Sequence, residues 1–223
     1  MAAPTSTLPV RVGSDEAGKG PVLGPMVAAA VRVDTDALPP AVDDSKRLTP
    51  ARREELDAEI RDAARGVGVA VVTTSRIDAP ETDMNTLTVD AHAEALSNVA
   101  VDGDTVSADA GDVSESRFAR RVAAGVGDRG VAIEVRAEHG ADATYPAVAA
   151  ASIVAKVERD RRVEQLNTEY GAVGSGYPSD PTTRTFLREY VRDHGSLPDC
   201  ARASWKTCDD VLRAAEQSAL DEF

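Results

Sequence analysis

Two adjacent carboxylates, Asp15 and Glu16, follow a short apolar stretch at residues 8–12 and stand just before a Gly-Lys-Gly turn at residues 18–20. A strand that delivers a carboxylate to its tip, with such a turn beyond it, can hold a divalent cation and present backbone N–H groups to a phosphate or sugar. Glycine permits this close approach because it has no side chain. The segment therefore predicts a metal-dependent phosphodiesterase.

Alternating strand and helix patterns surround these residues. Strands are expected at 8–13, 22–33, 67–73, 104–109 and 131–137, and helices at 50–64, 75–100, 114–124 and 146–170. Asp109 ends one predicted strand, and Asp142 lies just before the long alanine-rich helix. Beyond a glycine-rich loop at Gly174 the pattern is helical, so we predict a mixed α/β core with a helical C-terminal region.

Six separated blocks of sequence, taken together and in order, resemble type 2 ribonuclease H (ribonuclease HII). The blocks are residues 13–21, 44–48, 108–110, 139–143, 149–160 and 174–180. The resemblance covers roughly residues 9–210 and implies a ribonuclease H-like mixed β-sheet flanked by helices. It further implies a catalytic core at 1–170, a helical substrate-binding region at 171–216 and a sliding-clamp-binding tail at 217–223.

The resemblance also implies a catalytic site made of four acids. Its metal ligands would be Asp15, Glu16, Asp109 and Asp142, which would hold two Mg²⁺ or Mn²⁺ ions. Crowded carboxylates repel one another by about 4 kcal/mol for each close pair at an effective dielectric constant of about 20, so cations must compensate them. The expected reaction is hydrolysis of the RNA strand of RNA–DNA hybrids, and incision 5′ of ribonucleotides embedded in duplex DNA, leaving 3′-hydroxyl and 5′-phosphate ends.

Substrate recognition is expected at three further places. The family reads the ribose-to-deoxyribose junction with a turn and an aromatic ring, here Gly18, Lys19, Gly20 and Tyr177. Family members usually carry arginine in place of Lys19. The change is mild if backbone groups do the reading, but it weakens junction selectivity if recognition needs a bidentate fork. Ser45 and Lys46 are candidates for contact with the phosphate backbone, or they belong to a loop that simply leads into a helix.

Several residues have two interpretations. His139 is either a proton shuttle or substrate contact, or a half-exposed histidine at a strand end. Asp160 is either an acid near the metal or the i,i+4 partner of Lys156 on the long helix. Trp205, the sole tryptophan, is expected to anchor the C-terminal helices rather than stack on a base.

The end of the chain resembles a sliding-clamp-binding peptide. Gln217, Leu220 and Phe223 stand at the expected intervals, but no second aromatic residue follows. Such a short match also arises by chance, and the alternative is a frayed helix end. A terminal position favours clamp binding, since a free tail can dock without disturbing the fold.

The net charge of −13, with a pI near 4.7, has the wrong sign for a protein that binds a polyanion. A salt-adapted surface resolves the conflict, because the Debye length falls to about 3 Å in molar salt. The alternative is an ordinary acidic cytosolic protein.

We expect Cys200 and Cys208 to be reduced thiols. With no signal peptide or membrane segment apparent, we expect a cytoplasmic monomer.

Two rival functions remain. A type 3 ribonuclease H also carries Gly-Lys-Gly, but an additional N-terminal domain is expected in that family, whereas the core begins at about residue 9 here. A nucleic-acid-binding or clamp-binding module that has lost catalysis would lack some of the four acids, and all four are present. The sequence therefore favours the type 2 enzyme.

Overall fold

The computed structural model describes residues 10–42 and 48–221. The chain divides into two compact units that interleave in the sequence. Unit 1 holds residues 1–17, 27–71 and 85–158, and unit 2 holds residues 18–26, 72–84 and 159–223. The functional roles predicted for 1–170, 171–216 and 217–223 stay predictions, since a compact unit does not by itself reveal a role.

Unit 1 is built around a mixed sheet with the strand order β3-β2-β1-β4-β5. Its strands are β1 (Val10–Ala17), β2 (Met26–Asp34), β3 (Gly66–Val72), β4 (Thr105–Asp109) and β5 (Glu134–Glu138). β1 pairs antiparallel with β2 and parallel with β4, and β4 pairs parallel with β5. The predicted mixed sheet is confirmed, and β1 lies at its centre.

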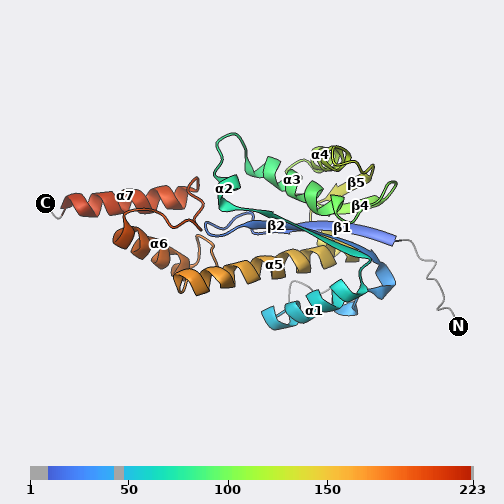
Figure 1. Cartoon of the computed structure of the whole chain (residues 1–223), viewed down its shortest axis with the longest axis horizontal. Coiled ribbons are helices and arrows are strands. Elements are labelled where there is room, and N and C mark those ends of the chain that lie inside the picture. The colour runs from blue at the N-terminus through green and yellow to red at the C-terminus, as the bar shows by residue number, and fades with distance from the viewer. Residues whose placement is uncertain (1–9, 43–47, 222–223) are drawn as a thin grey trace. The chain divides into compact units, whose positions relative to one another are not determined.

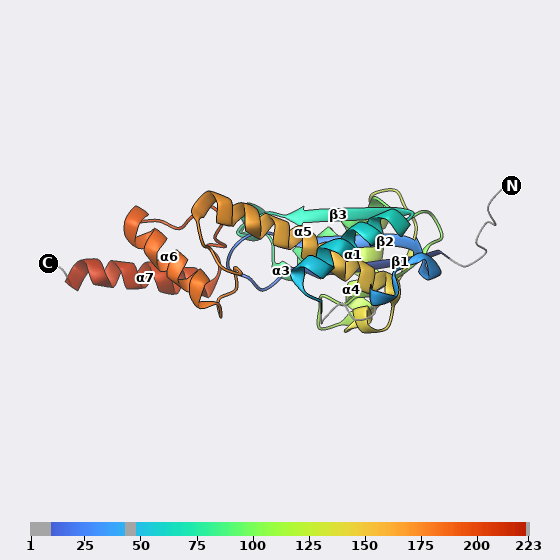
Figure 2. The ribbon, with the colours of Figure 1, turned by 90° about the horizontal axis from the view of Figure 1, so that it is seen from below.

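Helices cover both faces of this sheet. α1 (Pro50–Ala63) and the first half of α5 (Pro146–Tyr170) lie on one face, and α3 (Met84–Ser97) and α4 (Glu115–Gly127) lie on the other (Figures 1 and 2). The bounds of α5 are those predicted. Side-chain caps begin two helices as expected, since Thr49 accepts from the backbone N–H of Arg52 in α1 and Ser114 caps α4 in the same way.

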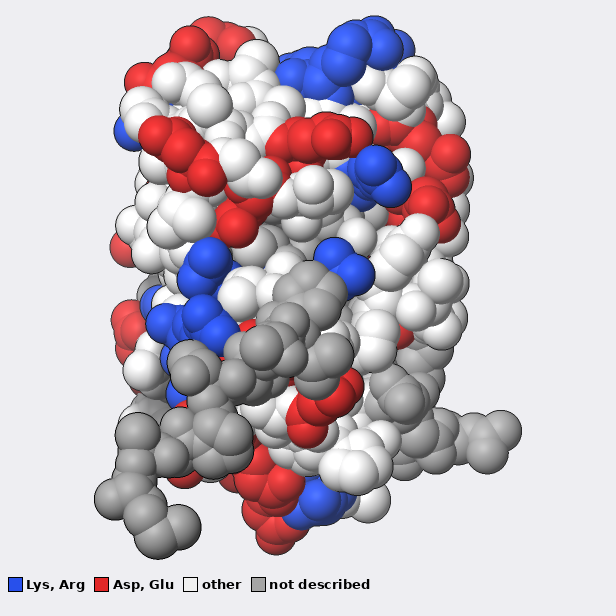
Figure 3. Space-filling view, turned by 90° about the vertical axis from the view of Figure 1, so that its right-hand side faces the viewer, with Lys and Arg blue, Asp and Glu red and all other residues white. Residues whose placement is uncertain are grey.

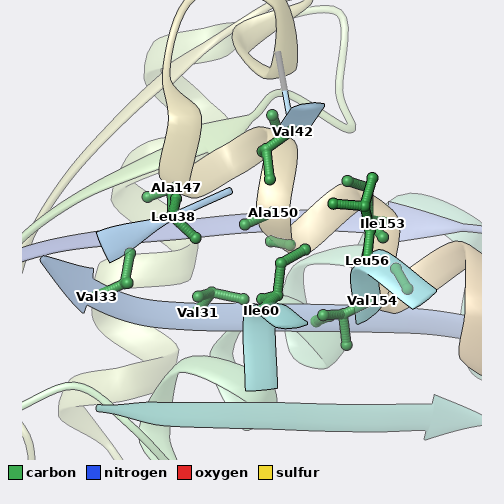
Figure 4. Close-up of a cluster of buried hydrophobic side chains, with 14 of the residues drawn as sticks. Val31, Val33, Leu38, Val42, Leu56, Ile60, Ala147, Ala150, Ile153 and Val154 are labelled. Atoms are coloured by element: carbon green, nitrogen blue, oxygen red, sulfur yellow. The ribbon is translucent and has the colours of Figure 1, made fainter. Parts of the chain in front are cut away.

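The core between β2, α1 and α5 is made of small and branched apolar side chains. Figure 4 shows them interleaved: Val31 and Val33 from β2, Leu56 and Ile60 from α1, and Ala147, Ala150, Ile153 and Val154 from α5. Alanines on α5 let the helix lie close to the sheet. The closest approach is at Gly13 of β1, where an added Cβ would overlap the backbone of Ala147 and Val148. This packing fixes α5 over the central strand.

Unit 2 is mostly helical. It contains α2 (Thr74–Ile77), the second half of α5, α6 (Pro181–His194) and α7 (Lys206–Asp221). Its core includes Val22, Leu23, Val173, Leu187 and Cys208. Cys200 and Cys208 are buried and unpaired, as predicted.

The expected strand and helix bounds differ most from the structure at three places. β1 continues through the two acids instead of ending at Gly13, because its pairing with β2 runs on to Ala17 and Val27. β2 begins at Met26 rather than at Val22, because the intervening chain turns at Gly24, whose φ is 77°. The helix predicted at 75–100 is two helices, interrupted by a stretch that contains Pro80.

Among the residues that the structure describes, none of the helices combines the length and the apolar composition needed to cross a bilayer.

Candidate active site

Asp15 is a buried carboxylate on the central strand. It is 5% exposed, and its neighbours include the Ser152 hydroxyl of α5. Lys156 donates to Ser152 Oγ over 2.7 Å, which directs the hydroxyl hydrogen of Ser152 toward Asp15. Burial, together with the charges of Glu16 and Asp109, raises the pKa of Asp15 from 3.8 to about 7, although the hydrogen bond from Ser152 acts in the opposite direction. Asp15 therefore lies where a cation would be favoured.

The adjacent Glu16 faces the other side of the sheet. Successive strand residues point to opposite faces, so Asp15 points to the α5 side, like Gly13, and Glu16 to the α3 side. There Glu16 Oε2 lies 2.9 Å from Nε2 of His92, which belongs to α3. Sequence reasoning placed both acids at a strand tip, whereas both lie within β1, opposite Ala29 and Ala28 of β2. The alanines leave room for the acids beside the neighbouring strand.

Asp109 ends β4, as predicted, and holds the loop that carries Asp142. Its Oδ1 accepts from the backbone N–H groups of Gly140 and Ala141 over 2.7 and 3.2 Å. Gly140 has a left-handed backbone, with φ of 68°, and begins the short 3₁₀ helix η3 (Ala141–Ala143) that contains the buried Asp142. The charge of Asp109 thus raises the pKa of Asp15, and its hydrogen bonds hold the loop of Asp142.

The donors that these four acids offer are all carboxylate oxygens, which suit Mg²⁺ and Mn²⁺. A buried aspartate whose charge is opposed by two other carboxylates fits a cation site, because a cation would relieve that repulsion. In the part of the chain that the structure describes, no three His, Cys, Asp or Glu side chains are arranged to hold a metal ion. The roles of Asp15, Glu16, Asp109 and Asp142 as ligands stay predictions.

The turn at Gly18, Lys19 and Gly20 belongs to unit 2, where a buried arginine holds it. Arg202 donates to the carbonyl oxygens of Gly18 and Lys19 over 2.6 and 2.9 Å. It also donates to Gly24 O over 2.9 Å, and its guanidinium stacks 5.0 Å from the ring centroid of Trp205. The backbone of the turn is therefore fixed from one side.

Gly18 has a φ of 83°, and a Cβ added there would lie 2.5 Å from Arg159 Cδ. Both the left-handed backbone and the close contact require glycine at this position. Arg159 is itself 6% exposed, and burial lowers its pKa.

Tyr177 lies beside the same turn. A Cβ added at Gly20 would be 3.9 Å from its Cε1, and the Arg159 guanidinium lies 5.4 Å from its ring centroid. Tyr177 is 42% exposed. The Tyr177 loop is tied to the segment after the turn because Gly176 O accepts from the N–H of Val22. Tyr177 and the Gly-Lys-Gly turn, which lie far apart in the sequence, are thus neighbours.

Sequence reasoning missed three residues here, His92, Arg159 and Arg202. His92 had a weak signal, since it adjoins the apolar face of its helix formed by Leu87, Ala91 and Ala95. No pattern in the sequence marked Arg202, because its partners are backbone groups of a distant segment. Trp205 is partly buried and packs against the core of unit 2, which agrees with its predicted anchoring role.

Other predicted residues lie elsewhere or are not described. Ser45, Lys46 and Phe223 lie outside the described residues. His139 is exposed, and its backbone N–H donates to Glu115 Oε1 over 2.8 Å. Asp160 is exposed on α5, and its pairing with Lys156 stays a prediction.

The tail prediction is modified by the course of α7. The helix continues to Asp221, so Gln217 and Leu220 belong to helix rather than to a free tail. Clamp binding by Gln217, Leu220 and Phe223 stays a prediction.

Charges of both signs share the surface that the structure describes. On the face shown in Figure 3, groups of Lys and Arg lie among groups of Asp and Glu, with uncharged residues between them. The net charge of −13 is therefore not concentrated in one continuous acidic patch on this face.

Comparison with known proteins gives a consistent result. The sequence model of the family described as Ribonuclease HII matches residues 12–208. A ribonuclease HII of Haloarcula marismortui is 63% identical over 214 residues, which cover 96% of this chain and 100% of that protein.

Two solved structures of ribonucleases are also similar to this chain. The crystal structure of ribonuclease H2 from Pyrococcus horikoshii OT3 superposes with a TM-score of 0.86 at 38% identity, covering 94% of this chain and 100% of that one. The ribonuclease HII of Archaeoglobus fulgidus, solved in complex with PCNA, has a TM-score of 0.80 at 40% identity, covering 89% and 96%. The chain therefore belongs to the ribonuclease HII family and is a type 2 ribonuclease H of halophilic archaeal character.

Proposed function

We propose that the chain hydrolyses the RNA strand of RNA–DNA hybrids and incises 5′ of single ribonucleotides embedded in duplex DNA, with Mg²⁺ or Mn²⁺. Family membership supports the ribonuclease H activity. The observation that carries the site is Asp15, a buried carboxylate whose pKa of about 7 reflects burial and the nearby charges of Glu16 and Asp109. Such perturbed acids are typical of catalytic sites.

Asp15, Glu16, Asp109 and Asp142 are the residues we propose to hold the cations. Bound there, two ions would activate the attacking water and stabilise the departing 3′-oxygen, leaving 3′-hydroxyl and 5′-phosphate ends. Asp15 is oriented by the Lys156–Ser152 hydrogen bond, and Asp109 positions the loop of Asp142 through the N–H groups of that loop. The protein thus contributes fixed oxygen donors.

The turn at Gly18, Lys19 and Gly20 is proposed to recognise the ribose 2′-hydroxyl through its backbone. In a trans peptide the C=O and N–H groups point to opposite sides. Because Arg202 binds the carbonyls of Gly18 and Lys19, the N–H groups of Lys19 and Gly20 point away from Arg202. These N–H groups, rather than the Lys19 side chain, would then read the sugar, so lysine can replace the usual arginine.

Tyr177 is proposed to pack its ring against the deoxyribose that follows the ribonucleotide. Its partial exposure and its place beside Gly20 support this role, and the Arg159 guanidinium holds the ring from one side. Ser45 and Lys46 are proposed to contact the phosphate backbone.

A sliding clamp is the proposed protein partner. The relative from Archaeoglobus fulgidus was solved with PCNA, and the residues at 217, 220 and 223 have the spacing of a clamp-binding peptide. The clamp would then bind the end of α7, the helix to which Gln217 and Leu220 belong.

The experiment that tests the proposed function uses an end-labelled DNA duplex with one ribonucleotide, a duplex with a four-ribonucleotide block and an all-RNA hybrid. Each is incubated with Mg²⁺ or Mn²⁺ from low to molar KCl. Asp109→Asn should abolish cleavage of all three while the far-UV circular dichroism is unchanged. Asp62→Asn, an exposed aspartate of α1, is the matched control and should cleave like the wild type.

Incision 5′ of the lone ribonucleotide supports junction recognition with Lys19 in place. Cleavage of only the longer RNA tracts contradicts that specificity but still supports the proposed ribonuclease activity. No cleavage at any salt concentration would support a binding module, and retained activity of Asp109→Asn would remove this residue from the site.

A further inference from the structure

We propose that His92 is a positioning residue that fixes the Glu16 carboxylate for cation binding, an inference that rests on the proposed metal site. His92 lies on α3 and is fully buried. Its ring is not a ligand in the proposed mechanism, yet both ring nitrogens are directed at β1 (Val10–Ala17), the strand that carries Asp15 and Glu16. A buried histidine with both nitrogens bound to the strand of the catalytic acids invites a functional explanation.

The two contacts of His92 come from residues on one face of β1. Ser14 Oγ lies 2.7 Å from Nδ1, and Glu16 Oε2 lies 2.9 Å from Nε2. Ser14 and Glu16 are two residues apart on a strand, so their side chains share a face. A single imidazole therefore bridges two successive positions on that face, and rotation of the Glu16 side chain would break one of its contacts.

Hydrogen-bond chemistry fixes the direction of these contacts. An ionised carboxylate only accepts, so Nε2 must carry the hydrogen that is shared with Glu16. The Ser14 hydroxyl can donate or accept, so it satisfies Nδ1 in whichever form the ring adopts. With Glu16 ionised, Nε2–H of His92 donates to Oε2 of its carboxylate.

Packing holds the imidazole and the carboxylate from further sides. The Phe118 ring meets the His92 ring edge-on, with the centroids 5.1 Å apart. A Cβ added at Gly111 would lie 3.1 Å from Glu16 Oε1 and 2.6 Å from Thr88 Cγ2. Oε2 is therefore held by His92, and Oε1 lies close over Gly111.

This arrangement would lower the cost of cation binding because the carboxylate is already oriented. Hydrogen-bond partners of ligating groups typically change metal affinity or activity by about 10–100-fold when they are removed. We expect an effect of this size on the Mn²⁺ affinity, since replacing the imidazole would remove the hydrogen bond that orients Glu16 Oε2.

The test compares three substitutions of His92 in the full chain at constant KCl. His92→Phe keeps a ring of similar shape and removes both nitrogens. The amide of His92→Gln reaches about as far as Nε2 and retains the donor to Glu16, whereas that of His92→Asn reaches only about as far as Nδ1. His194→Phe is the matched control, because His194 is exposed on α6 and stacks on Tyr190.

Mn²⁺ binding is measured by calorimetry and by electron paramagnetic resonance, without substrate, after thermal melting has shown which variants are folded. We expect His92→Phe and His92→Asn to bind Mn²⁺ about 10–100-fold more weakly than the wild type, and His92→Gln and His194→Phe to bind within a few-fold of it. If His92→Phe does not fold, the Mn²⁺ affinities of the Asn and Gln variants still test the role of His92.

Wild-type affinity in His92→Asn, or equal loss in the Gln and Asn variants, would overturn the role of His92 while leaving the metal site intact. Asp109→Asn separates the two claims. If Asp109→Asn binds Mn²⁺ as tightly as the wild type, the proposed ligand set itself is wrong, whatever the affinities of the His92 variants.

Discussion

Replacing Asp15 by Asn should stabilise the protein in the absence of divalent cations. Asp15 binds its proton more tightly in the folded chain than in the unfolded chain, because its pKa rises from 3.8 to about 7 on burial near Glu16 and Asp109. Ionised Asp15 therefore opposes folding. Its cost is absent below about pH 4, grows as the pH rises toward 7 and is constant above that.

The magnitude follows from the two pKa values. Their difference, about three, corresponds to at most about 4 kcal/mol of unfolding free energy at about pH 8. At about pH 5 only about 1–2 kcal/mol of this cost is present. Asn has nearly the shape of Asp and no charge, so the advantage of Asp15→Asn over the wild type should grow by about 2–3 kcal/mol between these pH values.

Urea unfolding of both proteins at about pH 5 and about pH 8, at one KCl concentration and with EDTA, measures this difference. Adding Mn²⁺ should then stabilise the wild type more than Asp15→Asn, because only the wild type offers the charged oxygen. A difference in unfolding free energy that does not change with pH, or an Asn variant less stable than the wild type at high pH, would refute this electrostatic reasoning.

Two further predictions concern unit 2. Arg202→Met should lower the unfolding free energy by about 3 kcal/mol, because the carbonyls of Gly18, Lys19 and Gly24 lose their buried donor. Urea unfolding measures this loss of stability, and a loss below about 1 kcal/mol would contradict the prediction. Burial raises the pKa of Cys200 to about 12 and that of Cys208 to about 11, so iodoacetamide at about pH 8 should label neither thiol before denaturation and both after it, as mass spectrometry can check.

Much of the fold could be predicted from local signals. Thr49 before Pro50 identified the start of α1. The strand that ends at Asp109 and the helix from Pro146 to Tyr170 were also predicted with their observed ends. These features depend on residues close together in the sequence, which is why composition and periodicity reveal them.

Boundaries that depend on distant partners were not predictable. β1 continues through Asp15 and Glu16 because β2 pairs with it as far as Ala17, and no residue near the acids signals this pairing. Long-range backbone pairing therefore decided that the acids lie inside a strand, on opposite faces of the sheet.

The sequence by itself determined the family, through six blocks of residues in one order, and it also predicted the four acids and the Gly-Lys-Gly turn as site residues. Only the tertiary structure decided what holds them. His92 comes to Glu16 from 76 positions away, and Arg202 comes to Gly18 from 184 positions away. Hydrogen bonds across such separations depend on how the sheet and helices pack, and a single sequence carries no local record of that packing.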